Sequence, residues 1–128
     1  MKTLDASALA NFLLVPEAFH KHVPILKDNL IAPAILVPEV LNALKKAYLT
    51  KRVSRAQANQ AAKYFASFNI TLVTLSAYRH EMWELVNNLS TYDASYVLVA
   101  RLTQTPLVTS DSRLVKAAPS DIEVVLLR

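Results

Sequence analysis

The chain alternates short apolar runs of the strand type with longer segments whose apolar residues recur at helical spacing. Such alternation is typical of α/β proteins, in which helices connect the strands of a largely parallel sheet. We therefore predict an α/β fold with a central, mostly parallel sheet. The expected strands are Lys2 to Leu4, Ile31 to Ala34, Ile70 to Leu75, Pro106 to Thr109 and Ile122 to Leu127.

The clearest helix is predicted over residues 54–68, where Ser54 and Gln57 match a capping box and the apolar residues form one stripe. The segment after Tyr92 is apolar nearly all round, which predicts a helix buried on several sides. Two further helices are expected, one after Pro38 and one with Ser76 as its N-cap.

Two residue types are missing, and each absence excludes classes of function. The 128 residues contain no cysteine, which excludes disulfide scaffolds, thiol nucleophiles and cysteine-ligated metal sites. They also contain no glycine, so the glycine-dependent phosphate loops and the nucleophile elbow of serine hydrolases are excluded. A chain of this length fits one compact domain, and we expect residues 1–128 to form it. Any phosphate chemistry must then be done by side chains.

The charge balance favours polyanionic partners without proving them. Fourteen Lys and Arg residues against ten Asp and Glu residues give a net charge of +4. The N-terminal apolar stretch is interrupted by Asn11 and lacks a signal-peptide cleavage site, and no apolar segment has the length of a membrane span. We expect a cytoplasmic protein with no membrane partner.

Four carboxylates far apart in sequence stand where a predicted strand ends or a predicted helix begins: Asp5, Glu39, Asp93 and Asp111. The carboxyl ends of parallel strands share one edge, and ligands bind at that edge. Four converging acids repel one another unless a divalent cation neutralises them, and Mg²⁺ or Mn²⁺ prefers such oxygen ligands. Taken singly, each acid is also explained as a helix cap or as a first-turn partner of the helix dipole. The ordered set favours a metal site.

Polar neighbours accompany these acids. Ser7 follows Asp5 by two residues, Asn42 lies one helical turn after Glu39, and Thr109 shares a strand face with Asp111. We predict that these three support the site, although local backbone bonding explains Ser7 and Thr109 equally well. A basic group is a candidate RNA-backbone track, or else an ordinary solvated face; it comprises Lys45, Lys46, Lys51, Arg52 and Arg55.

Four stretches resemble, in order and spacing, the acidic motifs of the PIN-domain ribonucleases, and most closely of the VapC-type toxins of toxin–antitoxin pairs. These stretches are LDASAL (4–9), APAILVPEVLNAL (32–44), YDASYVLVA (92–100) and PLVTSDSRLVKAA (106–118). By this resemblance Asp5, Glu39, Asp93 and Asp111 match the metal-binding acids, and Thr109 matches a small hydroxyl residue of the last motif. Asp5 and Asp111 are expected as the central ligands.

The resemblance implies an α/β/α sandwich and Mg²⁺- or Mn²⁺-dependent cleavage of RNA. It also implies a homodimer and inhibition by a small VapB-like antitoxin that covers the active site. Two alternatives stay open: a non-catalytic RNA- or protein-binding domain of the same fold, and a housekeeping RNA-processing nuclease.

Overall fold

A computed structural model describes residues 1–128, with five parallel strands in one sheet of order β3-β2-β1-β4-β5. The registers pair Thr3 of β1 with Ile31 on one side and with Leu107 on the other. The predicted parallel α/β architecture is therefore confirmed. The strands are β1 (Lys2–Leu4), β2 (Leu30–Pro33), β3 (Thr71–Val73), β4 (Leu107–Thr109) and β5 (Val124–Leu126).

Each strand lies within or close to its predicted run but is short, at three or four residues. The predicted strands were longer than the observed ones, because the apolar runs continue beyond the paired residues. Thr74 and Leu75, for example, were expected in a strand but lie beyond β3 and lead into a helical turn. A strand ends where its pairing with a neighbouring strand ends, and the apolar character of the residues does not predict that pairing.

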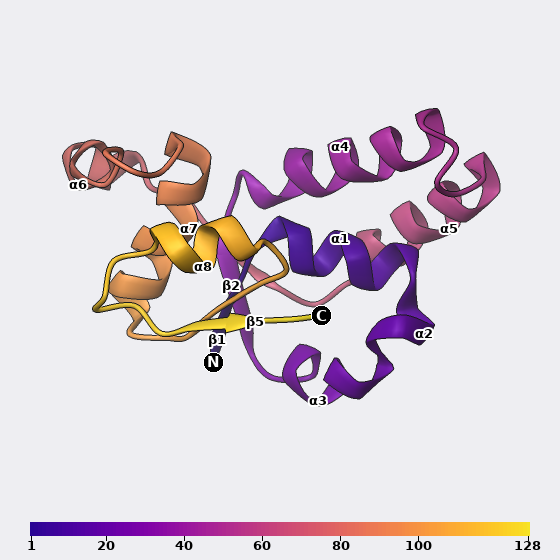
Figure 1. Ribbon diagram of the computed structural model, residues 1–128, viewed down its shortest axis with the longest axis horizontal. Helices are drawn as coiled ribbons and strands as arrows, with labels where there is room; N and C mark the ends of the chain where they lie inside the picture. The colour runs from indigo at the N-terminus through magenta and orange to yellow at the C-terminus, as the bar shows by residue number, and fades with distance from the viewer.

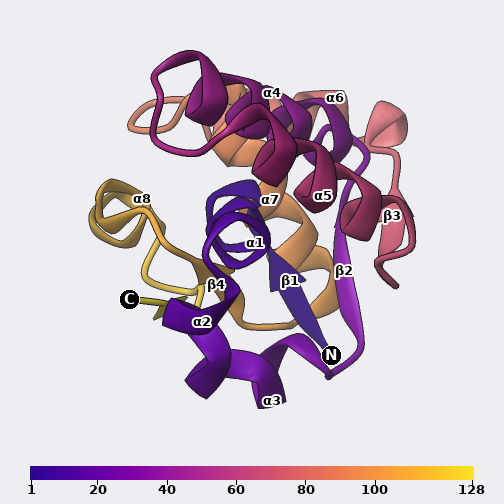
Figure 2. The same cartoon turned by 90° about the vertical axis from the view of Figure 1, so that its right-hand side faces the viewer.

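Helices cover both faces of the sheet. Right-handed crossovers explain the layers, because the chain moves outward from β1 to β2 and β3, then returns past β1 to β4 and β5. Figure 1 shows α1, α4 and α5 on one side of the strands and α7 and α8 on the other; in Figure 2 α1 lies in front and α7 behind. The main helices are α1 (Ala6–Leu14), α4 (Leu36–Leu49), α5 (Arg55–Ala66), α7 (Thr91–Thr103) and α8 (Ser112–Ala117).

Shorter helical pieces fill two connections. Between α1 and β2 lie α2 (Pro16–Phe19), the 3₁₀ turn η1 (His20–His22) and α3 (Val23–Leu26). Between β3 and α7 lie the 3₁₀ turn η2 (Ser76–Tyr78) and α6 (Arg79–Glu84).

The predicted helix starts were right in one case and displaced in two others. The capping box of Ser54 and Gln57 is present at the start of α5. Helix α4 begins two residues before Pro38, which is tolerated because the first-turn amides have no partner within the helix. Ser76 caps no helix: its hydroxyl contacts that of Thr74, and α6 starts only at Arg79.

The buried core lies between the sheet and its helices. Residues 94–100 of α7 are all buried, as the all-round apolar pattern predicted, while α1 and α4 pack their apolar faces together. None of the helices combines the length and apolarity needed to span a bilayer.

Candidate active site

The four predicted acids come together at the point where the sheet changes winding direction. From β1 the chain leaves to the face covered by α1, and from the adjacent β4 it leaves to the face covered by α8. Such a switch between neighbouring parallel strands opens a crevice at their carboxyl ends. Asp5 directly follows β1 and Asp111 lies two residues beyond β4, so both acids stand at the carboxyl ends of the two strands that form this switch.

Asp5 is the most enclosed of the acids, with only 6% of its surface exposed. Its Oδ2 atom accepts hydrogen bonds from the hydroxyls of Ser7 at 2.6 Å and Thr109 at 2.8 Å. Asp5 occupies the N-cap position of α1, yet its side chain makes no capping hydrogen bond. The capping explanation therefore does not account for Asp5, and its carboxylate is oriented by neighbouring hydroxyls instead.

The same two hydroxyls shape the turn that carries Asp111. The Ser110 amide donates to Ser7 Oγ at 3.0 Å, and the Asp111 amide donates to Thr109 Oγ1 at 3.0 Å. Ser7 and Thr109 thus bind Asp5 and the β4–α8 turn at once. Both hydroxyls therefore take part in backbone bonding and also donate to the Asp5 carboxylate, and their supporting role in the site stays a prediction.

Glu39 lies in the first turn of α4 and is held from α7. The hydroxyl of Tyr96, whose side chain is fully buried, donates to Glu39 Oε1 at 2.6 Å. Burial, together with this hydrogen bond and the nearby carboxylates, keeps the pKa of Tyr96 far above its ordinary value, so the phenol remains a donor. Sequence analysis missed Tyr96; its one signal was its place one helical turn after Asp93.

Asp93 and Asp111 occupy different positions at their helix starts. Ser90 is the N-cap of α7, and its hydroxyl accepts from the Asp93 amide at 3.0 Å, so Asp93 is not needed as a cap. Asp111 does cap α8, accepting from the Arg113 amide at 2.9 Å, and the Arg113 side chain approaches the same oxygen at 3.4 Å. Asp111 alone makes a side-chain capping bond, while Glu39 and Asp93 stand in the first turns of their helices, where a carboxylate complements the helix dipole.

The acids interact electrostatically. Burial raises the pKa of Asp5, while hydrogen bonds from Ser7 and Thr109 pull it back down. The pKa of Glu39 is raised by burial and by the charges of Asp5 and Asp93, against the lowering effect of Tyr96. The pKa of Asp93 is raised by burial and by the charges of Asp5 and Asp111. Three carboxyls are therefore harder to ionise than usual, and all four acids are linked through these charge effects.

The family comparison agrees with this geometry, because the model of the PIN domain matches residues 2–119. The chain belongs to the PIN-domain family. Among its relatives is Ribonuclease VapC1 of Mycobacterium tuberculosis, 33% identical over 111 residues that cover 81% of this chain and 80% of the relative. Ribonuclease VapC9 of the same species is 30% identical over 114 residues, covering 89% and 88%. The crystal structure of PAE2754 from Pyrobaculum aerophilum matches with TM-score 0.68 and 28% identity, covering 97% of this chain and 83% of that one.

The acids of this PIN domain converge without forming a closed cage. No three Asp, Glu or His side chains lie close enough together to surround a metal ion at once. Three of the four acids instead have hydrogen-bond partners of their own: Asp5 at Ser7 and Thr109, Glu39 at Tyr96, Asp111 at Arg113. Their assignment as metal ligands stays a prediction.

Asn42 and the basic group lie apart from the acids of the PIN domain. Asn42 is exposed and makes no hydrogen bond to Glu39; both line an open hollow. Lys45 and Lys46 lie in the second half of α4, roughly 10 Å along the helix from Glu39, whereas Lys51, Arg52 and Arg55 stand at the turn between α4 and α5. Arg55 stacks on Tyr48 with its guanidinium 4.6 Å from the ring centroid, and Arg52 contacts Asn11. Figure 1 shows this turn far from the strands.

Arg113 is the cation nearest to the acids, and sequence analysis did not single it out. Its side chain is 91% exposed beside Asp111. Its position two residues after the last acid was the available signal.

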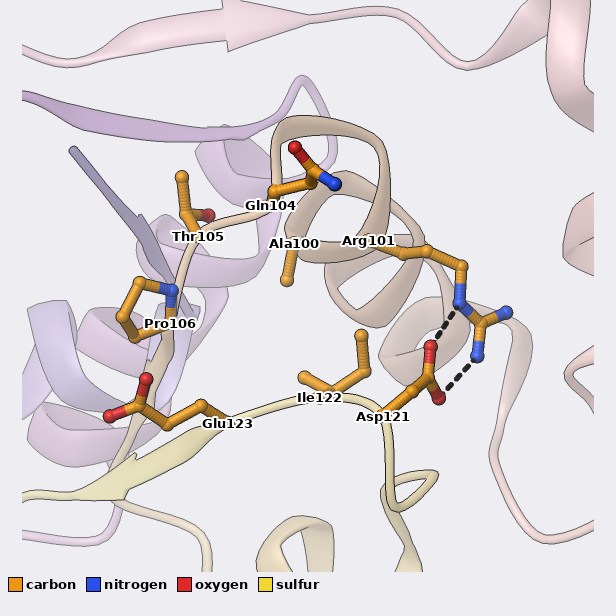
Figure 3. Close-up of a pocket in the computed structure, with 8 residues that line it drawn as sticks. All are labelled: Ala100, Arg101, Gln104, Thr105, Pro106, Asp121, Ile122 and Glu123. Carbon is orange, nitrogen blue, oxygen red and sulfur yellow. Dashed lines mark hydrogen bonds and ion pairs between the residues drawn. The ribbon is translucent and has the colours of Figure 1, made fainter.

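A second pocket of the PIN domain lies at the other edge of the sheet. It is lined by the end of α7 and by the residues just before β4 and β5, and the ion pair between Arg101 and Asp121 forms one wall (Figure 3). None of the four acids lines it, so it is separate from the site described above.

Proposed function

We propose that this PIN-domain chain is a metal-dependent endoribonuclease and the toxin of a VapC-type toxin–antitoxin pair. Its relatives VapC1 and VapC9 carry the name ribonuclease, and they match most of the chain. The observation that carries the proposal is the convergence of four electrostatically linked acids at the winding switch of the sheet. Helix capping does not require acids at Asp5 or Asp93.

The donor set fits a hard divalent cation, and we expect Mg²⁺ or Mn²⁺. Four carboxylates offer oxygen ligands only. Burial and, after it, the charges of neighbouring acids raise the pKa values of Glu39 and Asp93, and a bound cation would relieve that repulsion. Asp5 and Asp111 would be the central ligands, with Glu39 and Asp93 completing the site. When bound, a divalent cation supplies the charge that activates water and stabilises the departing oxygen of a phosphodiester.

The chain's own side chains prepare this site. Ser7 and Thr109 bind one oxygen of Asp5, which leaves its other oxygen facing no side-chain donor. Tyr96 binds one oxygen of Glu39 in the same way. Each carboxylate is thereby held through one oxygen, which is how supporting hydrogen bonds orient metal-binding carboxylates in proteins. Cleavage by water is expected to leave a 5′-phosphate.

The direct test measures cleavage of single-stranded RNA by the purified protein with Mn²⁺, with Mg²⁺ and with EDTA. We expect cleavage with either ion, none in EDTA, and none from Asp5→Asn. Asp28→Asn is the matched control, because Asp28 is a half-buried partner of Lys2 at the opposite edge of the sheet. If the RNA stays intact at saturating Mn²⁺, the nuclease proposal is wrong and a non-catalytic binding domain is favoured. Such a domain should bind RNA or a protein partner equally well with Asn at position 5.

Toxin and housekeeping nuclease are separated in cells. We expect expression to arrest growth, Asp5→Asn to abolish the arrest, and a small VapB-like antitoxin encoded beside the gene to relieve it. Normal growth of cells that express cleavage-competent protein would favour the housekeeping enzyme. We further propose that residues 1–128 act as one nuclease domain, as a homodimer, in the cytoplasm; sizing chromatography and cell fractionation test the last two points.

A further inference from the structure

An open hollow adjoins the acids on the side of α4. It is lined by Ile35, Pro38, Glu39 and Asn42 from the start of α4 and by Tyr92 from the start of α7. The hydrogen bond from Tyr96 to Glu39 joins the second turn of α7 to the first turn of α4. Because Glu39 belongs to both the hollow and the acid cluster, a group in the hollow lies next to any phosphate bound at the acids.

The lining suits a flat heterocycle with polar edges. Tyr92 is 57% exposed, although residues 94–100 of the same helix are buried, so its ring is not used for packing. Ile35 and Pro38 add apolar surface, and the amide of Asn42, which makes no hydrogen bond in the protein, offers both donors and an acceptor. Aromatic stacking combined with hydrogen bonding to exposed edges is how proteins bind unpaired nucleobases.

No other hollow joins this combination to the acids. The hollow between α1 and α5 has the aromatic rings of Phe12 and Tyr64 beside the amides of Gln57 and Gln60, but none of the four acids lines it. The groove formed by α4, α5 and β3 around Leu41 and Phe65 is lined by apolar residues alone and has no polar group to orient a base. The pocket with the Arg101–Asp121 ion pair has no aromatic residue and lies at the opposite edge of the sheet (Figure 3).

Positive charge along α4 suits an RNA strand that continues beyond the hollow. Lys45 and Lys46 lie one helical turn after Asn42, both are exposed, and neither forms an ion pair. They are the part of the basic group closest to the acids, and they can neutralise the next phosphate along a single strand.

We propose that this hollow binds the nucleobase next to the scissile phosphate of a single-stranded RNA, with Tyr92 stacking on its face and Asn42 bonding its edge. The proposal rests on the proposed ribonuclease function. It assigns recognition of one nucleotide to Tyr92 and Asn42, and it leaves the acids to the reaction itself.

The test uses the full chain and a short RNA with one cleavage site. Tyr92→Ala is expected to lower kcat/KM roughly tenfold through loss of stacking, while Tyr92→Phe retains activity. Asn42→Ala is expected to change which base is preferred beside the cut. Trp83→Ala is the matched control, since Trp83 is 69% exposed on α6 and lines none of the hollows described here.

Two further measurements keep the outcomes distinct. In an Asp5→Asn background, RNA binding followed by fluorescence anisotropy should weaken with Tyr92→Ala but not with Tyr92→Phe. An RNA lacking the base beside the cut should be cleaved equally by the wild type and by Tyr92→Ala. If the wild type cleaves RNA and folded Tyr92→Ala and Asn42→Ala match it in rate, binding and base preference, the subsite is wrong while the nuclease stands. If the wild type cleaves no RNA, the proposed function itself fails.

Discussion

Acidic residues lie at both edges of the sheet, but their surroundings shift their pKa values in opposite directions. At the amino edge two acids have basic partners: Asp121 forms a bidentate ion pair with Arg101, and Asp28 pairs with Lys2 (Figure 3 shows the first). These partners lower the pKa values of both acids. At the carboxyl edge burial raises the pKa values of Asp5, Glu39 and Asp93, and neighbouring carboxylates add to the rise for Glu39 and Asp93.

The acids at the amino edge are compatible with a stable fold, whereas those at the carboxyl edge reduce its stability. An exposed ion pair contributes little to stability, but it also carries no penalty. A buried cluster of like charges opposes folding, and such clusters of perturbed groups concentrate at functional sites. The carboxyl edge is therefore where substitution should change activity most, and the amino edge supplies matched controls.

The largest contrast is expected between Asp93→Asn and Asp121→Asn. Loss of a carboxylate from the proposed metal site should lower the RNA cleavage rate by about 10³-fold, equivalent to several kcal/mol of transition-state stabilisation. Asp121→Asn should leave the rate unchanged, because Asp121 lies at the opposite edge. Equal rates for the two variants in a Mn²⁺-dependent cleavage assay would remove Asp93 from the site.

Two buried threonines provide the next comparison. Thr109→Val deletes the hydroxyl that donates to Asp5 and should lower cleavage about 10- to 100-fold, as for other groups that orient metal ligands. Thr3→Val deletes an equally buried hydroxyl, which in β1 contacts the hydroxyl of Thr105. It should reduce stability by about 1 kcal/mol and leave cleavage intact. Chemical denaturation and cleavage rates measured on both variants separate the two effects.

A smaller effect is expected for Tyr96→Phe, which removes only the hydroxyl bound to Glu39. Without that donor Glu39 is less fixed, so the apparent affinity for Mn²⁺ should fall roughly tenfold. The KM for RNA should not change. Calorimetric titration with Mn²⁺ gives a readout independent of cleavage, and Tyr78→Phe is the control because its hydroxyl makes no hydrogen bond. An unchanged Mn²⁺ affinity would show that Tyr96 contributes packing only and does not orient Glu39 for metal binding.

The smallest effect concerns stability without metal. Because the pKa of Asp93 is raised in the folded state above its ordinary value of 3.8, its contribution to stability is full below that value and is lost as pH rises through the folded pKa. Asp93→Asn should therefore raise the melting temperature at pH 7 in EDTA by about 2 °C, and the gain should vanish near pH 3. For Asp121, whose pKa is lowered by Arg101, the sign reverses: its contribution to stability is present at pH 7 and lost at low pH, so Asp121→Asn should lower the melting temperature slightly at pH 7. Thermal melts at the two pH values decide between these signs.

Local signals explain which predictions from sequence succeeded. The capping box of Ser54 and Gln57 lies within four residues, and the apolar pattern of α7 reports burial directly, so both were predictable. Ser76 was misassigned because a serine before a helical pattern caps a helix only if the backbone there is extended, and a 3₁₀ turn took its place. The approach of Ser7 and Thr109 to Asp5 was suggested by sequence only as one of two options.

The sequence by itself determined the parallel α/β layout and the order of the four acidic motifs, because hydrophobic periodicity and motif spacing are properties of the chain. Tertiary structure alone decided how the acids are held. Tyr96 reaches Glu39 across 57 residues, and Thr109 reaches Asp5 across 104. It also decided that Asn42 opens to a hollow beside Tyr92 instead of bonding Glu39. Those contacts depend on strand order and helix placement, which set the distances between side chains that the sequence keeps far apart.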